Sequence, residues 1–509
     1  MLRPPRRPAS LLPALVLALA GALVAPGPAT ATGAALAPVS PEDGPAAAAQ
    51  EALATAEDAL AGPAGDPAAG SPDASLALLD LALAAADLEG DDRARARRLL
   101  ARPTDGPAAE LGGGYTTDDV ERACDDDLCV HHVTTTADAA TGTFARRALE
   151  VMGEVRSHHV DELGLRAPVP DAGTAAKGGD ARFDVYLADI GGSGLYGFCS
   201  PEAAEGPQRR VRPSYCVLDN DYAPDEFGRR QTPDDNLRVT AAHEFLHAVQ
   251  YAYDAGEDTW LLESTATWVE ERFADDVDDN RQFLADGQVG RPRVPLDRHT
   301  GAYGNWAFVE HLTTRFGVDL VRETLEAAAA PLDGSPGGGL SSVPALTTAL
   351  AGRGGDLREA YARFAADNLA PGRSPYYPEG AAWGLRAPVA RQETLRPSHR
   401  AVRFEAEPAH LSSTSLGLHS RGLPAGTRLR LAVDGPPGAA QPAVVVTTRR
   451  ADGTLGRRYV PLTGPAGTAT VRTDVTSSRV LGVTVTLVSA SPRREDDGRR
   501  FVVEARALR

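Results

Sequence analysis

Two histidines and a glutamate occur in the sequence at the spacing HExxH, as His243, Glu244 and His247. Histidines four positions apart lie on one face of an α-helix, roughly 6 Å apart along its axis, so both imidazoles can bind one metal ion. Glu244 lies at the edge of the same face, where its carboxylate can take a proton from water bound to that ion. The spacing therefore predicts two metal ligands and a general base on one helix.

The surrounding sequence favours that helix. Apolar residues recur at helical spacing, at Val239, Ala242, Leu246 and Val249. Asn236 offers N-cap chemistry before them, and residues 254–256 offer a stop. The alternative is an accidental HExxH on a solvated helix, which these signals disfavour.

A catalytic zinc ion ordinarily has three protein ligands and one open position. The metzincin extension is excluded, because Gln250 and Tyr253 occupy the positions where that motif needs Gly and then His or Asp. A glutamate from a second helix is the other source, and residues 260–271 contain Glu263 and Glu270. Glu263 is favoured, because the apolar start of this segment would bury its first turn against the HExxH helix. Glu270 would then orient a histidine ligand or lie on the surface.

HEFLH followed by WLLESTATWVEE resembles the gluzincins, the thermolysin-like and aminopeptidase-like zinc metallopeptidases. Their second motif reads roughly W-L-x-E-G-x-A-x-x-x-E, which aligns Glu263 with the zinc-binding glutamate. The chain departs from that pattern in having Ser264 at the usual glycine and only fifteen residues between His247 and Glu263. The resemblance covers about residues 183–317 and implies Zn2+ bound by His243, His247 and Glu263.

The resemblance also implies a donor for the oxyanion of the reaction. Tyr303 is similar to the tyrosine that several of these enzymes use; His299 and His311 are weaker candidates, and a simple aromatic anchor of the helix start is the structural alternative. Residues 182–190 alternate as a strand does and are expected to form the cleft rim on which an extended peptide adds.

The implied activity is hydrolysis of peptide bonds in a peptide or protein substrate, by metal-activated water with Glu244 as general base. An aminopeptidase is disfavoured, because no G-x-M-E-N-like segment for a free amine is present. The alternative from another class is a catalytically silent extracellular binding protein that keeps the zincin fold.

The first residues indicate export. Three arginines precede an apolar run over residues 11–24, and residues 29–31 read A-T-A, a signal-peptidase pattern. Residues 1–31 are therefore predicted to be the signal peptide of a secreted, extracellular protein. An uncleaved anchor is the alternative, although the run is short and interrupted by proline, and no later stretch predicts an integral membrane segment.

The four cysteines, Cys124, Cys129, Cys199 and Cys216, form an even set, which in an exported chain predicts disulfides. Three pairings are possible. Proximity in sequence favours Cys124 with Cys129 and Cys199 with Cys216. The alternative, a cysteine-based zinc site, is disfavoured because C-x4-C with a distant pair lacks zinc-ribbon spacing.

Charge separates the two halves of the chain. The net charge of -17 argues against a nucleic-acid partner, yet residues 401–509 hold 16 Arg against 9 Asp and Glu. This basic C-terminal domain could contact acidic cell-envelope polymers or the acidic catalytic domain, with a solubilising surface as the alternative. Residues 219–221 (Asp-Asn-Asp) could bind Ca2+, with a solvated acidic turn as the alternative.

The expected fold class is α+β, a thermolysin-like zincin catalytic domain over residues 113–370 followed by an all-β sandwich over residues 401–509. Residues 371–400 are predicted to be a linker. Residues 32–112 are rich in alanine, with roughly the first forty expected to be disordered and helices expected over 75–88 and 91–100. This segment is either a prosegment that blocks the cleft or a spacer.

Overall fold

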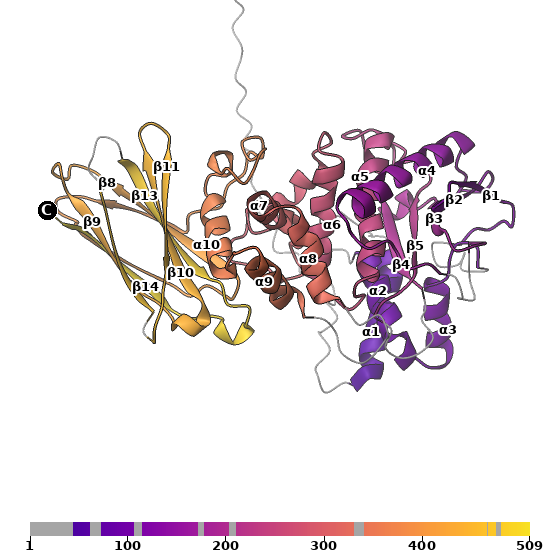
Figure 1. Cartoon of the computed structure of the whole chain (residues 1–509), viewed down its shortest axis with the longest axis horizontal. Helices are drawn as coiled ribbons and strands as arrows, with labels where there is room; N and C mark the ends of the chain where they lie inside the picture. Colours follow the sequence, from indigo (N-terminus) through magenta and orange to yellow (C-terminus); the bar gives the residue numbers. More distant parts are fainter. Residues whose placement is uncertain are drawn as a thin grey trace, which may run out of the picture. The chain divides into compact units, whose positions relative to one another are not determined.

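The structure, a computed structural model, describes residues 44–61, 73–105, 114–171, 178–202, 210–329, 340–465, 467–474 and 480–508. The predicted signal peptide lies outside these ranges. Within them the chain is of mixed α+β class, with helices and a sheet first and strands alone at the end (Figure 1). None of the described helices combines the length and the apolar character needed to cross a bilayer.

A five-stranded sheet organises the first part of the structure. Its strands are β1 (Val120–Cys124), β2 (Leu128–Val133), β3 (Phe183–Ala188), β4 (Gly197–Pro201) and β5 (Ser214–Asp219), in the order β1-β2-β3-β5-β4. β2, β3 and β5 run parallel, and the two outer strands pair antiparallel. Both favoured disulfides are present, Cys124–Cys129 between β1 and β2 and Cys199–Cys216 between β4 and β5.

Helices cover both faces of this sheet. Val185 and Leu187 of β3 pack with α4 (Gly142–Arg156) and α5 (Pro233–Tyr251). Tyr186 and Ala188 point to the other face, where they join the core of α1 (Gly44–Ala61), α2 (Ala74–Ala84) and α3 (Gly90–Leu99). The alternation of side chains along a strand thus buries the sheet between a layer formed by α4 and α5 and an N-terminal layer formed by α1, α2 and α3.

The N-terminal layer corrects one expectation. Residues 44–61 fall in the stretch expected to be disordered, yet they form α1. Ala49, Leu53, Ala56 and Leu60 recur at intervals of four, three and four and are buried. This stripe of small residues is weak as a sequence pattern, and it becomes stable only by packing against α2 and α3.

Five further helices follow α5: α6 (Thr259–Phe273), α7 (Trp306–Phe316), α8 (Asp319–Ala328), α9 (Ser342–Gly352) and α10 (Leu357–Asp367). The last three agree with helices that the sequence predicts over residues 318–329, 343–350 and 357–369. Two tryptophans fix α6 to its neighbours, because Trp260 Nε1 donates to Ser342 Oγ at 2.8 Å and Trp268 Nε1 donates to Glu310 Oε2 at 3.0 Å. α6 is therefore held by residues outside α5 as well as by its packing against α5.

The C-terminal part is a sandwich of two sheets, in the orders β11-β10-β13-β8-β6 and β12-β9-β14-β7. Its strands are β6 (Arg391–Leu395), β7 (Ala401–Ala406), β8 (Ser412–Ser420), β9 (Arg428–Asp434), β10 (Pro442–Arg450), β11 (Leu455–Pro461), β12 (Thr468–Asp474), β13 (Val480–Ser489) and β14 (Phe501–Leu508). The sequence predicts seven of these strands, over residues 401–406, 428–433, 443–448, 457–462, 468–472, 480–488 and 501–505. β6 lies within the range predicted as linker, and β8 escaped notice because its serines and threonines, such as Ser415, are polar residues buried within the sheet.

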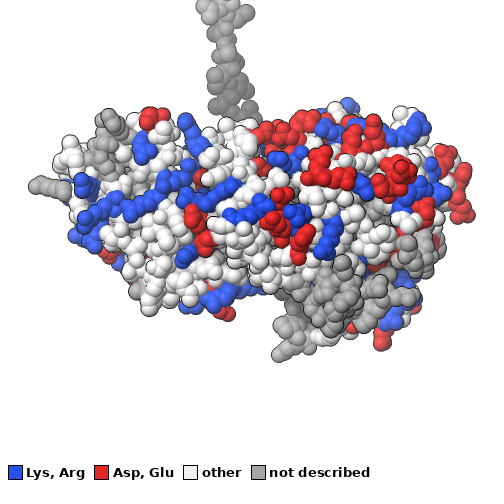
Figure 2. All heavy atoms as spheres, in the orientation of Figure 1, with Lys and Arg blue, Asp and Glu red and all other residues white. Residues whose placement is uncertain are grey.

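Charge is distributed unequally over the face shown in Figure 2. Blue Lys and Arg side chains run along the sandwich, whereas red Asp and Glu side chains gather over the helices of the first part. The two parts contact each other through polar pairs, including Arg457 Nε of β11 with Asp367 Oδ1 of α10 at 2.6 Å and His410 Nε2 with Asp297 Oδ1 at 2.9 Å. Part of the basic surface therefore faces acids of the same chain.

Candidate metal centre

The HExxH residues lie on α5, a helix buried on all sides from Thr240 to its end. It begins earlier than the sequence suggested. Thr232 is the N-cap, accepting from the Asp235 amide at 3.1 Å, while Asp235 Oδ2 accepts from the Thr232 amide at 3.0 Å. This capping box and Pro233 replace the expected cap at Asn236, because they satisfy the first free amides of the helix one turn earlier.

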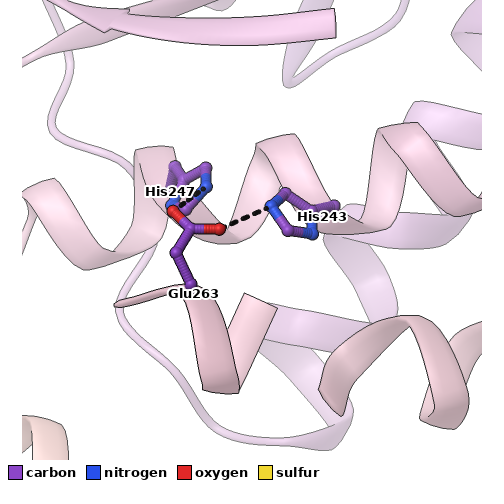
Figure 3. A group of neighbouring side chains, drawn as sticks. All are labelled: His243, His247 and Glu263. Carbon is purple, nitrogen blue, oxygen red and sulfur yellow. Dashed lines mark ion pairs between the residues drawn. The ribbon is translucent and has the colours of Figure 1, made fainter. Parts of the chain in front are cut away.

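His243, His247 and Glu263 converge from α5 and α6, as Figure 3 shows. His243 Nε2 lies 3.3 Å from Glu263 Oε2, and His247 Nε2 lies 3.5 Å from Glu263 Oε1. His247 and Glu263 are fully buried and His243 is 6% exposed. The short connection between the two helices thus suffices to bring the glutamate back to both histidines.

The converging atoms are poorly satisfied by the protein itself. Among the described residues, His247 Nε2 and both Glu263 oxygens have no hydrogen-bond partner of good geometry. Burying such groups unpaired costs free energy, since each loses its bonds to water. A divalent cation between them would satisfy all three, and one carboxylate with two imidazoles is a donor set that suits zinc.

The outer nitrogen of each histidine meets a different acceptor. His243 Nδ1 lies 2.6 Å from Glu270 Oε1, and His247 Nδ1 lies 2.8 Å from Gln250 Oε1. Gln250 is fixed in turn, because its Nε2 donates to Leu262 O and to Thr265 Oγ1, both at 2.9 Å. These contacts orient both rings with Nε2 toward Glu263, and they place Glu270 behind His243 rather than among the converging atoms.

Glu244 lies beneath the edge strand of the sheet. β4 passes so close to α5 that a Cβ on Gly197 would lie 2.7 Å from Thr240 Cγ2 and 3.1 Å from Glu244 Cγ. Glu244 is 6% exposed, and burial raises the pKa of its carboxyl while the imidazoles of His243 and His247 oppose that rise. A buried carboxylate with a raised pKa is suited to accept a proton.

Tyr303 reaches the same centre from a short 3-10 turn before α7. Its ring stacks on the His243 imidazole with centroids 5.4 Å apart and planes 8° apart. Burial raises the pKa of its hydroxyl well above the ordinary value, so the group remains a hydrogen-bond donor. His311, a rival donor, lies elsewhere, where its Nε2 contacts Asp367 Oδ2 at 3.0 Å.

The strand beside the centre is not the one expected. β3, predicted as the cleft rim, is the middle strand of the sheet and is paired on both sides by β2 and β5. β4 is the edge strand instead, and it pairs only with β5 among the described strands. The pattern of residues 182–190 is that of a strand, but strand order depends on contacts between distant segments.

Other candidate ligands lie apart from this centre. His131 Nε2 contacts Asp184 Oδ1 at 2.7 Å, and His159 Nε2 contacts the carbonyl of Ala242 at 2.9 Å, so these two histidines have structural partners. In the suggested calcium segment, Asp219 lies near Asp189 and Glu226, while its oxygens accept from the amides of residues 191, 221 and 222. These bonds explain the turn without an ion.

Sequence reasoning missed Gln250 and the N-terminal residues that meet Glu244 and Tyr303. The contact of Gln250 with His247 could have been predicted, because Gln250 lies three positions after His247 on the same helix. No family model matches the chain, and no curated protein matches it either. The interpretation of the centre therefore depends on its own geometry and chemistry.

Proposed function

We propose that the protein is a secreted zinc-dependent endopeptidase with a thermolysin-like catalytic domain. The observation that carries the proposal is the convergence of His243, His247 and Glu263 on one point where three buried polar atoms lack hydrogen bonds, beside the buried carboxylate of Glu244. A buried proton shared between His243 and Glu263 is the simplest competing explanation, but it leaves His247 Nε2 unsatisfied.

The spacing of the converging atoms supports zinc. Tetrahedral zinc with nitrogen and oxygen ligands at about 2.0–2.1 Å separates neighbouring ligand atoms by about 3.3 Å. The two imidazole nitrogens lie 3.3 and 3.5 Å from different oxygens of Glu263, and one donor atom from each of the three residues lies within 4.8 Å of the others, which is close enough for one small cation. Zinc bound there would act as a Lewis acid and lower the pKa of a water molecule to about 7.

The remaining groups act on protons and charge. Glu244 takes the proton of the attacking water and returns it to the leaving amine, which a buried carboxylate beside two imidazoles can do. The Tyr303 hydroxyl, a donor of raised pKa, stabilises the carbonyl oxygen as it becomes negative. Glu270 and Gln250 keep the two imidazoles turned toward Glu263.

An extended peptide is the substrate that best suits the surroundings. β4 presents a strand edge directly over Glu244, and a peptide can bind such an edge through main-chain hydrogen bonds regardless of its sequence. Export is supported by the predicted signal peptide and by the two disulfides, which persist in oxidising compartments.

Metal analysis combined with a peptide-library digest tests this function on the full chain. We expect about one zinc per chain, and cleavage within peptides that a chelator abolishes. Glu244→Gln should keep the zinc and lose hydrolysis, whereas Glu326→Gln, an exposed glutamate of α8, should change neither. Undiminished hydrolysis by Glu244→Gln would sink the mechanism.

A further inference from the structure

The N-cap and first turn of α2 contact the two groups that the proposed mechanism uses to move a proton and to stabilise charge, Glu244 and Tyr303. The Tyr303 hydroxyl donates to Asp73 Oδ2 at 2.5 Å. The Ser75 hydroxyl donates to Glu244 Oε2 at 2.8 Å and accepts from the Cys199 amide at 2.9 Å. The oxyanion donor, the base and the edge of β4 therefore all have partners in the N-terminal segment.

This turn is held firmly in place. Asp73 is the N-cap of α2, and its Oδ1 accepts from the Leu76 amide at 2.9 Å while its Oδ2 faces Tyr303. Behind it, Leu76 and Leu79 belong to one buried cluster with Tyr251 of α5, Leu262 of α6 and the Cys199–Cys216 disulfide. α2 thus lies against β4, α5 and α6 at once, in the space above Glu244.

On the premise that the proposed function is correct, we propose that α2 is an autoinhibitory plug, with Asp73 and Ser75 standing where the substrate must lie. A peptide that adds to β4 needs the Cys199 amide, which donates to Ser75. Its scissile carbonyl needs Tyr303 and Glu244, which are bound to Asp73 and Ser75. Hydrolysis therefore requires that the first turn of α2 move away.

A second set of contacts also holds the N-terminal segment in place. Arg102, beyond α3 in the same segment, is 2% exposed and forms ion pairs with Asp171, Asp184 and Glu202. The segment is consequently anchored at two places, at the metal centre and at this buried guanidinium. If the chain were cut between these two anchors, each piece would remain bound through its own anchor.

The test uses the full chain loaded with Co2+, whose visible absorption changes when a small ligand reaches the metal. Asp73→Ser with Ser75→Ala keeps a side-chain N-cap but removes both contacts to the site. We expect this variant to bind acetohydroxamate at least about tenfold more tightly than wild type and to cut library peptides at least about tenfold faster, as loss of two charge-assisted hydrogen bonds predicts. Asp87→Ala, an exposed aspartate just after α2, should match wild type.

The two readouts separate the plug from the peptidase. Equal hydroxamate affinity in wild type and the double variant overturns the plug, whatever the hydrolytic rates. Tighter hydroxamate binding without hydrolysis of any peptide supports the plug and refutes the peptidase. Circular dichroism checks folding; if the double variant unfolds, Ser75→Ala alone should bind the hydroxamate about threefold more tightly, and no change there also overturns the plug.

Discussion

Two buried clusters of charge in the α+β part differ in how the protein balances them. Around Arg102, three carboxylates share one guanidinium, and Asp184 also contacts His131 Nε2 at 2.7 Å. Around Glu263 the described neighbours are two imidazoles and a second acid, Glu270, and no described Lys or Arg forms an ion pair with either glutamate. The first cluster contains a cation, the Arg102 guanidinium, whereas the second contains donor atoms that could bind one.

The difference shows why burial alone does not identify a metal site. Both clusters are almost fully buried, and both contain acids with a histidine. Only the Glu263 cluster leaves both carboxylate oxygens and an imidazole nitrogen aimed at one another without hydrogen bonds. Converging polar atoms without hydrogen bonds are therefore the feature that indicates a metal site. Substitution should reduce metal binding at the Glu263 cluster and stability at the Arg102 cluster.

Removing a ligand from the second cluster should have the largest effect. His247→Ala is expected to lower zinc content from about one ion per chain to a residual trace, because two remaining ligands hold zinc poorly. Mass spectrometry of the metal after gel filtration measures this loss. His399→Ala, at an exposed histidine of the sandwich, should retain the ion; full occupancy in His247→Ala would show that the cluster does not bind metal.

Removing the cation from the first cluster should affect stability and leave the metal in place. Arg102→Met is expected to lower the free energy of unfolding by about 3–5 kcal/mol, because three buried carboxylates lose the charge they share. Denaturant titration gives the change, with exposed Arg97→Met as the control. If Arg102→Met loses zinc while its stability is unchanged, the proposed division between the clusters is wrong.

The orientation of a ligand should matter less than its presence. Gln250→Met removes the acceptor for His247 Nδ1 and should weaken zinc binding about 10–100-fold. Competition with a chromogenic chelator measures the affinity. Gln282→Met, on an exposed turn, provides the matched control, and equal affinities would mean that packing alone orients His247.

A third kind of acid, half-buried Glu257, which forms no ion pair with a described residue, predicts the smallest effect. Burial raises the pKa of Glu257 from 4.5 to about 7, opposed by the Asp258 amide. The folded state therefore holds this proton more tightly, so its contribution to stability falls as pH rises from 4.5 to about 7.

Glu257→Gln removes this penalty and can still accept from the amides of Asp258 and Ser342. It should raise the free energy of unfolding by about 1–2 kcal/mol near pH 8 and change it little near pH 4. Denaturant titration at both values measures the difference, and a gain of equal size at both would exclude titration as its cause.

The residues of the centre that could be predicted from the sequence are those fixed by local spacing. His243, Glu244 and His247 follow from the helical period, and Glu263 follows from an apolar second helix at short distance. β4 and the plug were not predictable in the same way. Their positions depend on strand order and on contacts between residues as distant as Ser75 and Glu244, for which no sequence period exists.

The fold shows the same division. Strands with alternating apolar residues, such as β3 and β13, and helices with clear stripes, such as α10, matched expectation. α1 and β8 did not, because most of their buried residues are alanine in α1 and serine or threonine in β8, which mark a core face only weakly. Whether such segments form a helix or a strand depends on their tertiary packing.

The helical hairpin of α5 and α6 has a consequence for the order in which the molecule assembles. All three converging residues and both groups that orient the imidazoles lie between His243 and Glu270, whereas β4, Tyr303 and α2 come from distant parts of the chain. Contacts between residues close in sequence form faster than contacts between distant ones. If the proposed function is correct, the hairpin would bind its ion before β4, Tyr303 and α2 are in place, so metal loading would precede the assembly of the peptide-binding edge.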